Sequence, residues 1–279
     1  MSDYEKLVSS IKEMGGVVVG YSGGVDSTLV AKAATDALGE KAVCVLIDSC
    51  FIPRSEIDEA VLRAGQLGFN LVRVRADALA IPNVPKNEPD RCYHCKKAVF
   101  SIMSEMAQQQ GLNCVLDGTN RDDEGDFRPG ERATRELGVR SPLKELGFAK
   151  ERVREISKEI GLPTWDKPSY ACLASRVPYG TALTRETLGQ VEAAESILHE
   201  LGFKQCRVRH HGDVARIELV PEEMDAIFAL ETRNLVAYRF RSLGYKYVAL
   251  DLLGYRMGSM NERLVGDDVN VKEWGVGSK

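Results

Sequence analysis

The sequence lacks several features that would place it in a broad functional class. No run of apolar residues is long enough to span a bilayer, and the chain opens on an amphipathic pattern rather than a signal segment, so we expect a cytoplasmic protein without a membrane partner. No block of like charge occurs, and 37 basic against 41 acidic residues leave a net charge of -4. A long nucleic-acid-binding face is therefore not expected.

Length and cysteine content indicate the number of domains and the chemical state of the cysteines. The 279 residues are enough for one large domain with a smaller appendage, and no internal repeat divides them. In a cytoplasmic protein the seven cysteines are expected to be thiols or metal ligands rather than disulfides.

Short apolar runs alternate with helical patterns over residues 1–163, which we take as the first domain. Strands are expected at 16–21, 42–48, 70–77 and 113–119. Strands that alternate with helices predict an α/β fold, a doubly wound and mostly parallel sheet with helices on both faces. The carboxyl ends of such strands share one edge of the sheet, and ligands bind along that edge.

The pattern changes after residue 163. Residues 164–184 show little periodicity and are expected to form an active-site loop or linker. A smaller α+β domain is expected at 185–257, followed by a polar tail at 258–279. Within this domain we expect a hairpin over 205–219, a helix over 221–243 and a strand over 245–253.

The stretch SGGVDS, residues 22–27, lies between an expected strand and an expected helix. Glycines let the backbone approach a ligand closely, and N–H groups at a helix start bind anions, so the stretch predicts a phosphate site. It lacks the lysine of a P-loop and the spacing of a dinucleotide fingerprint. The alternative is a glycine turn in which Asp26 or Ser27 caps the helix.

Three cysteines form a candidate metal or cluster site. Cys92 and Cys95 share one face at the start of an expected helix, and Cys172 lies in the irregular segment 169–180. The spacing leaves three interpretations open: an iron–sulfur cluster, a zinc site completed by His94 or Cys172, and a redox pair without metal.

SGGVDS resembles the pyrophosphate loop of the N-type ATP pyrophosphatases, which cleave ATP between the α and β phosphates. With DGTNRDDEGDFRPG (117–130), KPSYACLASRVPYGT (167–181) and RVRHHGDVARIE (207–218), the chain resembles the LarE-type ATP-dependent sulfur transferases over about residues 15–255. That resemblance implies that a carboxylate of pyridinium-3,5-biscarboxylic acid mononucleotide is adenylylated. Sulfur then replaces AMP and forms a thiocarboxylate of the nickel-pincer nucleotide, the cofactor of lactate racemase.

The resemblance also implies roles for the residues of the loop. Asp26 is expected to help hold Mg²⁺. The pyrophosphate of ATP is expected to contact Ser22, Gly23, Gly24, Ser27 and Gly118.

Members of the family divide by the source of sulfur. In one kind, the cysteine at the position of Cys172 gives up its own sulfur. In the other, three cysteines hold a [4Fe–4S] cluster whose open iron carries an extra sulfide. Because Cys92 and Cys95 are present, the resemblance implies the cluster kind, with Cys92, Cys95 and Cys172 as ligands and Cys172 as a catalytic residue.

Basic residues are candidates for binding the substrate. Arg207 and Arg209 alternate on one face of an expected strand, where they either grip the substrate phosphate or form an exposed pair on a hairpin. Arg176 and Lys96 lie near the expected cluster ligands in sequence and are candidates for phosphate or carboxylate. The remaining candidates are acidic: Asp122, Asp123 and Asp126 either bind Mg²⁺ or form a solvated turn, and Glu218 neutralises one of the arginines.

Two other functions remain open from the residues. A tRNA-thiolating enzyme of this kind would need a basic face, whereas an ammonia-dependent amide ligase of the NAD or GMP synthetase type would need no cysteine triad. The resemblance implies sulfide or a sulfur-donor protein as partner. It also implies a homo-oligomer, specifically a hexamer.

Overall fold

The computed structural model describes residues 1–123, 129–168 and 170–256. These residues form two compact units. The first contains residues 1–174 and 179–188, and the second contains residues 175–178 and the chain from Gly189 onward. Asp126 and the expected tail at 258–279 lie outside the described residues. None of the helices within the described ranges has the length and apolar character needed to cross a membrane.

A four-stranded parallel sheet forms the centre of the first unit. Its strands are β1 (Val17–Gly20), β2 (Ala42–Asp48), β3 (Asn70–Arg75) and β4 (Cys114–Leu116), in the order β3-β2-β1-β4. The chain builds outward from β1 to β3 and then returns to place β4 on the other side of β1. This order confirms the predicted doubly wound sheet, and it places the switch point where the loop after β1 leaves the sheet.

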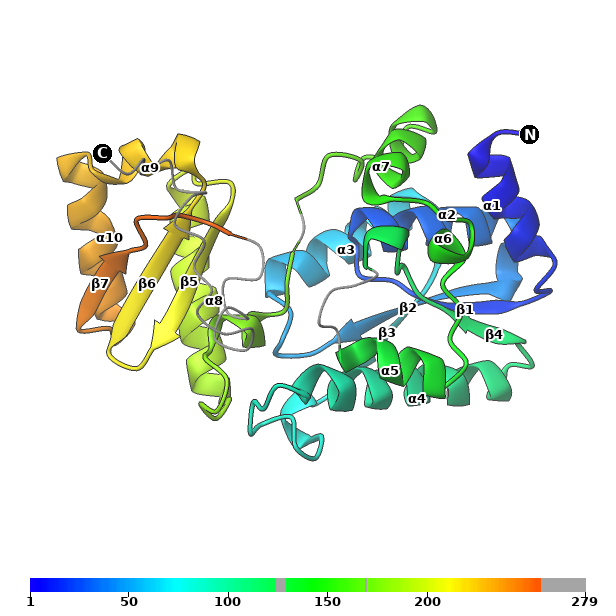
Figure 1. The fold of residues 1–279 in the computed structure, drawn as a ribbon, viewed down its shortest axis with the longest axis horizontal. Coiled ribbons are helices and arrows are strands. Elements are labelled where there is room, and N and C mark those ends of the chain that lie inside the picture. Colours follow the sequence, from blue (N-terminus) through cyan, green and yellow to red (C-terminus); the bar gives the residue numbers. More distant parts are fainter. Residues whose placement is uncertain (124–128, 169, 257–279) are drawn as a thin grey trace, which may run out of the picture. The chain divides into compact units, whose positions relative to one another are not determined.

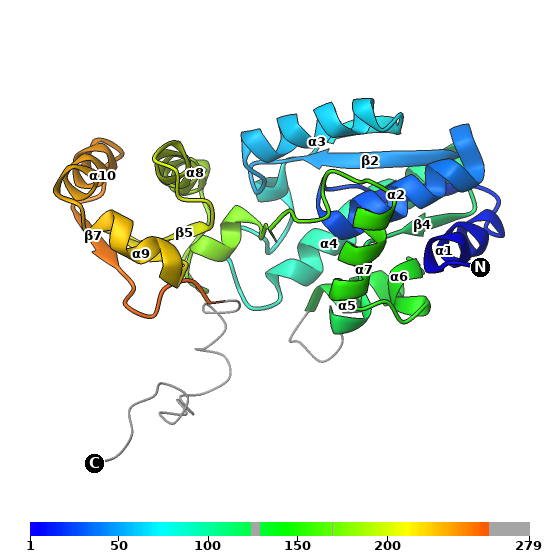
Figure 2. The ribbon, with the colours of Figure 1, turned by 90° about the horizontal axis from the view of Figure 1, so that it is seen from above.

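Helices cover both faces of this sheet (Figures 1 and 2). One face packs against α1 (Asp3–Lys12), α2 (Val25–Leu38), α3 (Arg54–Gln66), α6 (Pro142–Glu145) and α7 (Lys150–Glu159). The other face packs against α4 (Arg91–Gln109), which lies beside α5 (Pro129–Glu136). Alternate valines of β1 enter the two cores, since Val17 and Val19 belong to the first and Val18 to the second.

Strand β4 is shorter than predicted, because polar side chains turn the chain at residue 117. The buried carboxylate of Asp117 accepts hydrogen bonds from the backbone N–H of Thr119 at 3.1 Å and from the hydroxyl of Ser141 at 2.6 Å. Strand pairing therefore ends at Leu116 on this side, and the sequence 117–119 begins the loop that faces α2.

The second unit is built around a three-stranded sheet in the order β5-β6-β7. The predicted hairpin is confirmed, since β5 (Cys206–His211) pairs antiparallel with β6 (Val214–Leu219). Strand β7 (Tyr247–Leu250), shorter than expected, lies parallel to β6. The core contains Cys206, Val208, Ala215 and Ile217, and residues of α8 (Arg185–Glu200), α9 (Pro221–Ile227) and α10 (Leu230–Ser242) pack on it.

The single helix expected over 221–243 is wrong, because the chain breaks between α9 and α10. Ala229, with a non-helical ψ of 134°, is the N-cap of the second helix. Ile227 and Val236 both enter the core, but nine residues of continuous helix would place them on opposite faces. The break lets both helices turn an apolar side chain toward the same sheet.

Candidate active site

The loop between β1 and α2 needs its first glycine for two reasons. Gly23 has a φ of +73°, in the left-handed region that residues with a Cβ rarely adopt. A Cβ at this position would also lie 2.8 Å from the Cβ of Ala60 on α3. The tight turn and the close approach of α3 together position the start of α2.

Helix α2 begins with backbone N–H groups that no side chain caps. Its N-cap is Gly24, which has no side chain to offer. The hydroxyl of Ser27 turns back into the loop, accepting from the backbone N–H of Ser22 at 3.2 Å and lying 3.0 Å from the Ser22 hydroxyl. The loop therefore presents two hydroxyls and a helix start on one concave surface, an arrangement suited to an anion.

The turn after β4 closes this surface from the other side. A Cβ on Gly118 would lie 2.9 Å from the backbone nitrogen of Ser27 and 3.2 Å from the Cβ of Asp26. Glycine is thus required at residue 118 because two backbone segments approach within contact distance. The structure brings together all five residues expected to bind the pyrophosphate.

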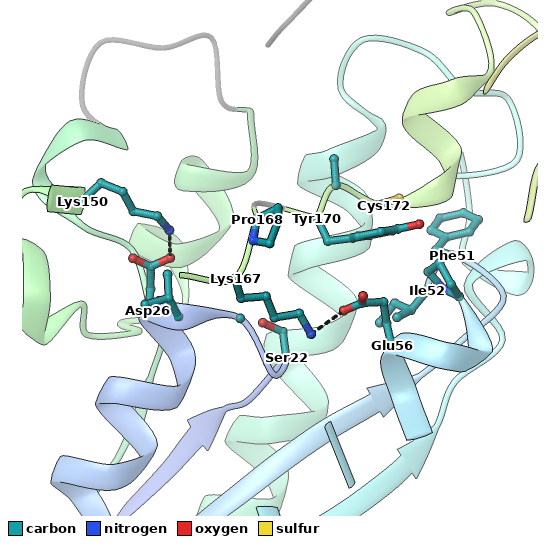
Figure 3. Close-up of a pocket in the computed structure, with 14 residues that line it drawn as sticks. Ser22, Asp26, Phe51, Ile52, Glu56, Lys150, Lys167, Pro168, Tyr170 and Cys172 are labelled. Carbon is teal, nitrogen blue, oxygen red and sulfur yellow. Dashed lines mark hydrogen bonds and ion pairs between the residues drawn. The ribbon is translucent and has the colours of Figure 1, made fainter. Parts of the chain in front are cut away.

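Asp26 points from the first turn of α2 toward Lys150 (Figure 3), and it has a second polar partner in Asn120. The side-chain amide of Asn120 donates to one carboxylate oxygen at 3.2 Å, and the ammonium of Lys150 donates to the other. Sequence reasoning missed both partners, which lie 94 and 124 residues away along the chain. No sequence pattern marks a pair that only folding brings together.

Asp122 and Asp123 hold the turn after β4 through hydrogen bonds to backbone N–H groups. Asp123 accepts from the backbone N–H of Asn120 at 2.9 Å, and Asp122 accepts from the backbone N–H of Lys150 at 2.8 Å. These bonds fix the loop against the start of α7. Over the described residues, no group of three or more His, Cys, Asp or Glu side chains is placed to hold a metal ion.

A cavity of about 340 Å³ lies on one side of the loop. Its walls include the apolar side chains of Val45, Phe100 and Met103, together with Cys95 and Lys96. Lys96 packs closely there, since a Cβ on Gly130 of α5 would lie 2.6 Å from its Cδ. This cavity offers an apolar slot beside a thiol.

A second cavity of about 350 Å³ lies on the other side of the loop (Figure 3). Its walls include Lys150, Lys167, Tyr170 and Cys172. Three residues of the loop belong to the walls of both cavities: Ser22, Gly24 and Asp26. The volumes suit parts of a nucleotide-sized ligand, and the shared loop lies where one ligand can extend from one cavity into the other.

Buried Arg91 contacts Cys92 and the segment that follows Cys172. Its guanidinium donates to the carbonyl oxygen of Ala174 at 3.1 Å and to the sulfur of Cys92 at 3.7 Å. Burial lowers the pKa of Arg91, but the nearby Cys172 and Cys92 outweigh that effect and raise it. Sequence reasoning did not single out this residue, which holds the loop after Cys172 against the start of α4.

The three thiols differ in exposure. Cys172 is exposed, Cys92 is partly buried, and Cys95 has its pKa raised to about 12, first by burial and then by the nearby Cys172 and Cys92. Thiolates are the ligands of iron–sulfur clusters, and each binds a different iron, so three thiols need not converge on one point. The donor set therefore fits a [4Fe–4S] cluster in its chemistry.

In the second unit, Arg207 and Arg209 lie on the face of β5 opposite its core residues, as predicted, but they are buried rather than exposed on a hairpin. Arg209 donates to both carboxylate oxygens of Glu218, at 2.9 and 2.6 Å. Arg207 lies 5.2 Å from the ring centroid of Tyr255. Glu218 thus neutralises Arg209, and it also accepts from Arg216 at 3.0 Å.

Arg176 is fully buried in the second unit. Its guanidinium donates to both carboxylate oxygens of Glu195, at 2.9 and 3.1 Å, and to the hydroxyl of Ser175 at 3.0 Å. Burial alone would raise the pKa of Glu195, but the charge and hydrogen bonds of Arg176 bring it below its ordinary value. The pair is a charged contact inside the unit, and sequence reasoning missed its acidic member.

Comparison with known proteins finds relatives over nearly the whole chain. The chain is 42% identical over 259 residues to the pyridinium-3,5-bisthiocarboxylic acid mononucleotide synthase of Lactiplantibacillus plantarum. The match covers 92% of this chain and 93% of that protein. The chain is also 42% identical over 263 residues to an uncharacterized protein of Synechocystis, covering 94% and 98% of the two chains.

Two further matches cover only part of the chain. Residues 4–85, which include the loop and α2, match the NAD synthase family. The glutamine-hydrolysing GMP synthase of Aliivibrio fischeri is 30% identical over 184 residues, which cover 57% of this chain and 35% of that enzyme. The family match lies within the first unit, whereas the relatives in Lactiplantibacillus and Synechocystis match more than nine-tenths of the chain and so extend through both units.

Proposed function

The chain belongs to the family of the pyridinium-3,5-bisthiocarboxylic acid mononucleotide synthases, and from that premise we propose that it is an ATP-dependent sulfur transferase. The proposed substrate is pyridinium-3,5-biscarboxylic acid mononucleotide. The enzyme adenylylates one of its carboxylates and converts it to a thiocarboxylate, releasing pyrophosphate and then AMP.

One observation carries the proposal. The SGGVDS loop forms a wall of two cavities, and each cavity contains one of the candidate sulfur-handling cysteines, Cys95 in one and Cys172 in the other. An activated carboxylate formed at the loop would therefore lie between thiols. An amide ligase of the NAD or GMP synthetase type has no chemical use for that arrangement.

ATP is proposed to span both cavities. Its adenosine occupies the apolar slot beside Phe100, and its phosphates extend over the loop, where the first N–H groups of α2 and the hydroxyls of Ser22 and Ser27 bind them. Asp26 supplies a carboxylate oxygen for Mg²⁺ in this proposal. Oxygen ligands from a carboxylate and the phosphates are the usual set for that ion.

Two displacements follow. A substrate carboxylate oxygen attacks the α-phosphorus, the bond to the bridging oxygen breaks, and that electron pair leaves with pyrophosphate. A sulfide then attacks the activated carbonyl carbon and expels AMP. Adenylylation is needed because a carboxylate is a poor electrophile with a poor leaving group. In the acyl adenylate the carbonyl carbon is more electrophilic, and AMP is a good leaving group.

Cys92, Cys95 and Cys172 are proposed to hold a [4Fe–4S] cluster, which when bound supplies an open iron that carries the sulfide. Cys95 must lose its proton to become a ligand, and its raised pKa makes this unfavourable without the metal. Arg91, whose guanidinium lies beside Cys92, offsets part of the negative charge of three thiolates.

The other proposed contacts concern substrate, donor and assembly. Arg207 and Arg209 are proposed to bind the phosphate of the mononucleotide, and Lys96 is proposed for another of its anionic groups. Arg176 is fully buried against Glu195, so its proposed role is to hold the segment before α8 in place rather than to contact substrate. Sulfide or a sulfur-donor protein replenishes the sulfur. We also propose a homo-oligomer, supported by large apolar side chains exposed in the second unit.

The deciding experiment compares three single variants, Cys92→Ala, Cys95→Ala and Cys172→Ala, with the native protein after anaerobic reconstitution. The control is Cys114→Ala, which removes a thiol of strand β4. Iron and sulfide content, thiocarboxylate formation and intact mass after turnover are measured. We expect all three variants to lose both iron and activity, while the control and the mass of the native protein stay unchanged.

Other outcomes separate the alternatives. An active, iron-free protein whose mass falls by that of H₂S, with dehydroalanine at Cys172, would replace the cluster by a sacrificial cysteine. Formation of an amide from ammonia, without any thiocarboxylate from the mononucleotide, would overturn the function as a whole.

A further inference from the structure

Lys150 contacts Asp26 of the SGGVDS loop. In the proposed function, Mg²⁺ binding to Asp26 would break this contact. The ammonium of Lys150 donates to one carboxylate oxygen of Asp26 (Figure 3), while the side-chain amide of Asn120 donates to the other at 3.2 Å. Both oxygens of Asp26 are thus engaged by protein donors. The two charged side chains are partly accessible, with 21% of Asp26 and 29% of Lys150 exposed.

Lys150 differs from the other lysine of the same cavity. Lys167 is only 11% exposed and pairs with Glu56 at 2.9 Å and Glu59 at 2.7 Å, so two carboxylates of α3 hold it. In the described part of the chain, the ammonium of Lys150 has Asp26 as its one ion-pair partner. Its backbone N–H is bound to Asp122 at 2.8 Å, which anchors the main chain at the start of α7 while the long side chain can change direction.

A divalent cation and an ammonium compete for the same carboxylate. If Asp26 binds Mg²⁺, as the proposed function has it, the cation takes the oxygen that Lys150 occupies and repels the ammonium. The nearest new source of negative charge is the polyphosphate that arrives with the cation. The lysine needs only a rotation of its side chain to reach a phosphate held over the loop it already contacts.

We infer that Lys150 is a ligand of the β and γ phosphates of ATP, which it meets when Mg²⁺ displaces it from Asp26. This inference rests on the proposed function. As the bond between the α-phosphorus and the bridging oxygen breaks, charge accumulates on the departing pyrophosphate, and the Lys150 ammonium stabilises it there. The pairing with Asp26 keeps both side chains neutralised before the nucleotide binds.

The test compares a ligand that lacks the β and γ phosphates with one that carries them. Calorimetric titrations measure the affinity of Lys150→Ala and Lys150→Gln for AMP and for the α,β-methylene analogue of ATP with Mg²⁺, which cannot be cleaved at the reacting bond. The matched control is Lys158→Ala on the same helix, whose ammonium lies 4.4 Å from the Trp165 ring centroid. We expect the analogue to bind about tenfold more weakly or worse in both Lys150 variants, with AMP binding and the control unchanged.

Two other outcomes of these titrations would contradict the inference, each in a different way. Equal weakening of AMP and the analogue would show that Lys150 only holds Asp26 and the loop in place, and unchanged affinity for the analogue would show that it does not meet the phosphates. Either overturns the inference while the proposed function stands. If the native protein bound neither ligand, ATP use itself would be wrong and the inference would fall with it.

Discussion

At the scale of single residues, Asp26 takes part in several of the contacts that form the site. It lies in the first turn of α2, where the helix start favours a negative group, and it accepts from Asn120 and Lys150 on two other segments. Removing its charge would therefore weaken the pairing with Lys150 and, in the proposed function, take away a ligand of Mg²⁺, whereas the shape of the side chain can be retained.

We predict that Asp26→Asn folds normally but loses ATP-dependent adenylylation by about tenfold or more, because one charged ligand of Mg²⁺ is gone. The measurement is pyrophosphate release in the presence of the mononucleotide, with circular dichroism as the check on folding. Release at the native rate would remove Asp26 from the metal site.

A second prediction concerns the buried arginines of β5. Arg207→Ala and Arg209→Ala should each weaken binding of the mononucleotide by roughly 1.5–3 kcal/mol, the usual cost of losing a hydrogen bond to a charged group, and leave ATP binding unchanged. Titration with each ligand measures this. Arg239→Ala serves as control, because that side chain pairs with Glu200 on an exposed helix surface. Equal losses for both ligands would assign the arginines to the ATP site.

At the scale of elements, α4 carries Cys92 and Cys95 and is fastened to α5 by one carboxylate. Glu136 accepts from the hydroxyl of Tyr93 at 2.7 Å, from Arg132 at 2.9 Å and from Lys97 at 3.2 Å. The guanidinium of Arg132 lies 4.0 Å from the Tyr93 ring centroid. These contacts hold α5 beside the turn of α4 that presents the cysteines.

The third prediction follows from the acidity of Glu136. The hydrogen bond from Tyr93, then that from Arg132, and then the contacts with Lys97 lower its pKa to about 2 from an ordinary 4.5. A lowered pKa in the folded state means that Glu136 stabilises the protein above about pH 4.5 and loses this contribution as the pH falls toward 2. Glu136→Gln should therefore lower the urea midpoint at pH 7.

The measurement is the difference in urea midpoint between the native protein and Glu136→Gln from pH 7 down to pH 2.5. It should shrink continuously below about pH 4.5. Glu105→Gln, at an exposed position on the neighbouring helix α4, is the control and should change little at any pH. A difference that is independent of pH would show that the carboxylate charge is not the source of the stability.

At the scale of the whole molecule, the second unit exposes large apolar side chains on and after its last helices. They are 41% to 81% exposed and comprise Phe228, Leu230, Leu235, Tyr238, Tyr247, Leu252 and Leu253. Exposed apolar side chains in such number are more typical of an association surface than of a monomer surface.

The fourth prediction is that the native protein sediments as a homo-oligomer and that Tyr247→Glu or Leu252→Glu shifts it toward smaller species. A buried charge without a partner would oppose association. Sedimentation velocity at several concentrations measures the distribution, and Leu62→Glu on α3, 62% exposed in the first unit, is the control. A native protein that remains monomeric at all concentrations would contradict the proposal.

Local patterns in the sequence determined much of the fold. The apolar run at 42–48 is strand β2 to the residue, and Gly23 and Gly24 form the turn between strand β1 and helix α2. Such features depend on residues that are neighbours in the chain, where backbone preference and periodicity act directly. The order of strands and helices then left few alternatives to a doubly wound sheet.

Tertiary structure decided what depends on residues far apart in sequence. Lys150 meets Asp26 across 124 residues, Arg91 meets the segment after Cys172 across more than eighty, and the helix break before Ala229 follows from the position of the core. Arg209 lies on the predicted strand face, yet its burial with Glu218 depends on what packs over that face. Ion pairs and burial arise only when the chain closes on itself, so they leave no periodic signal in the sequence.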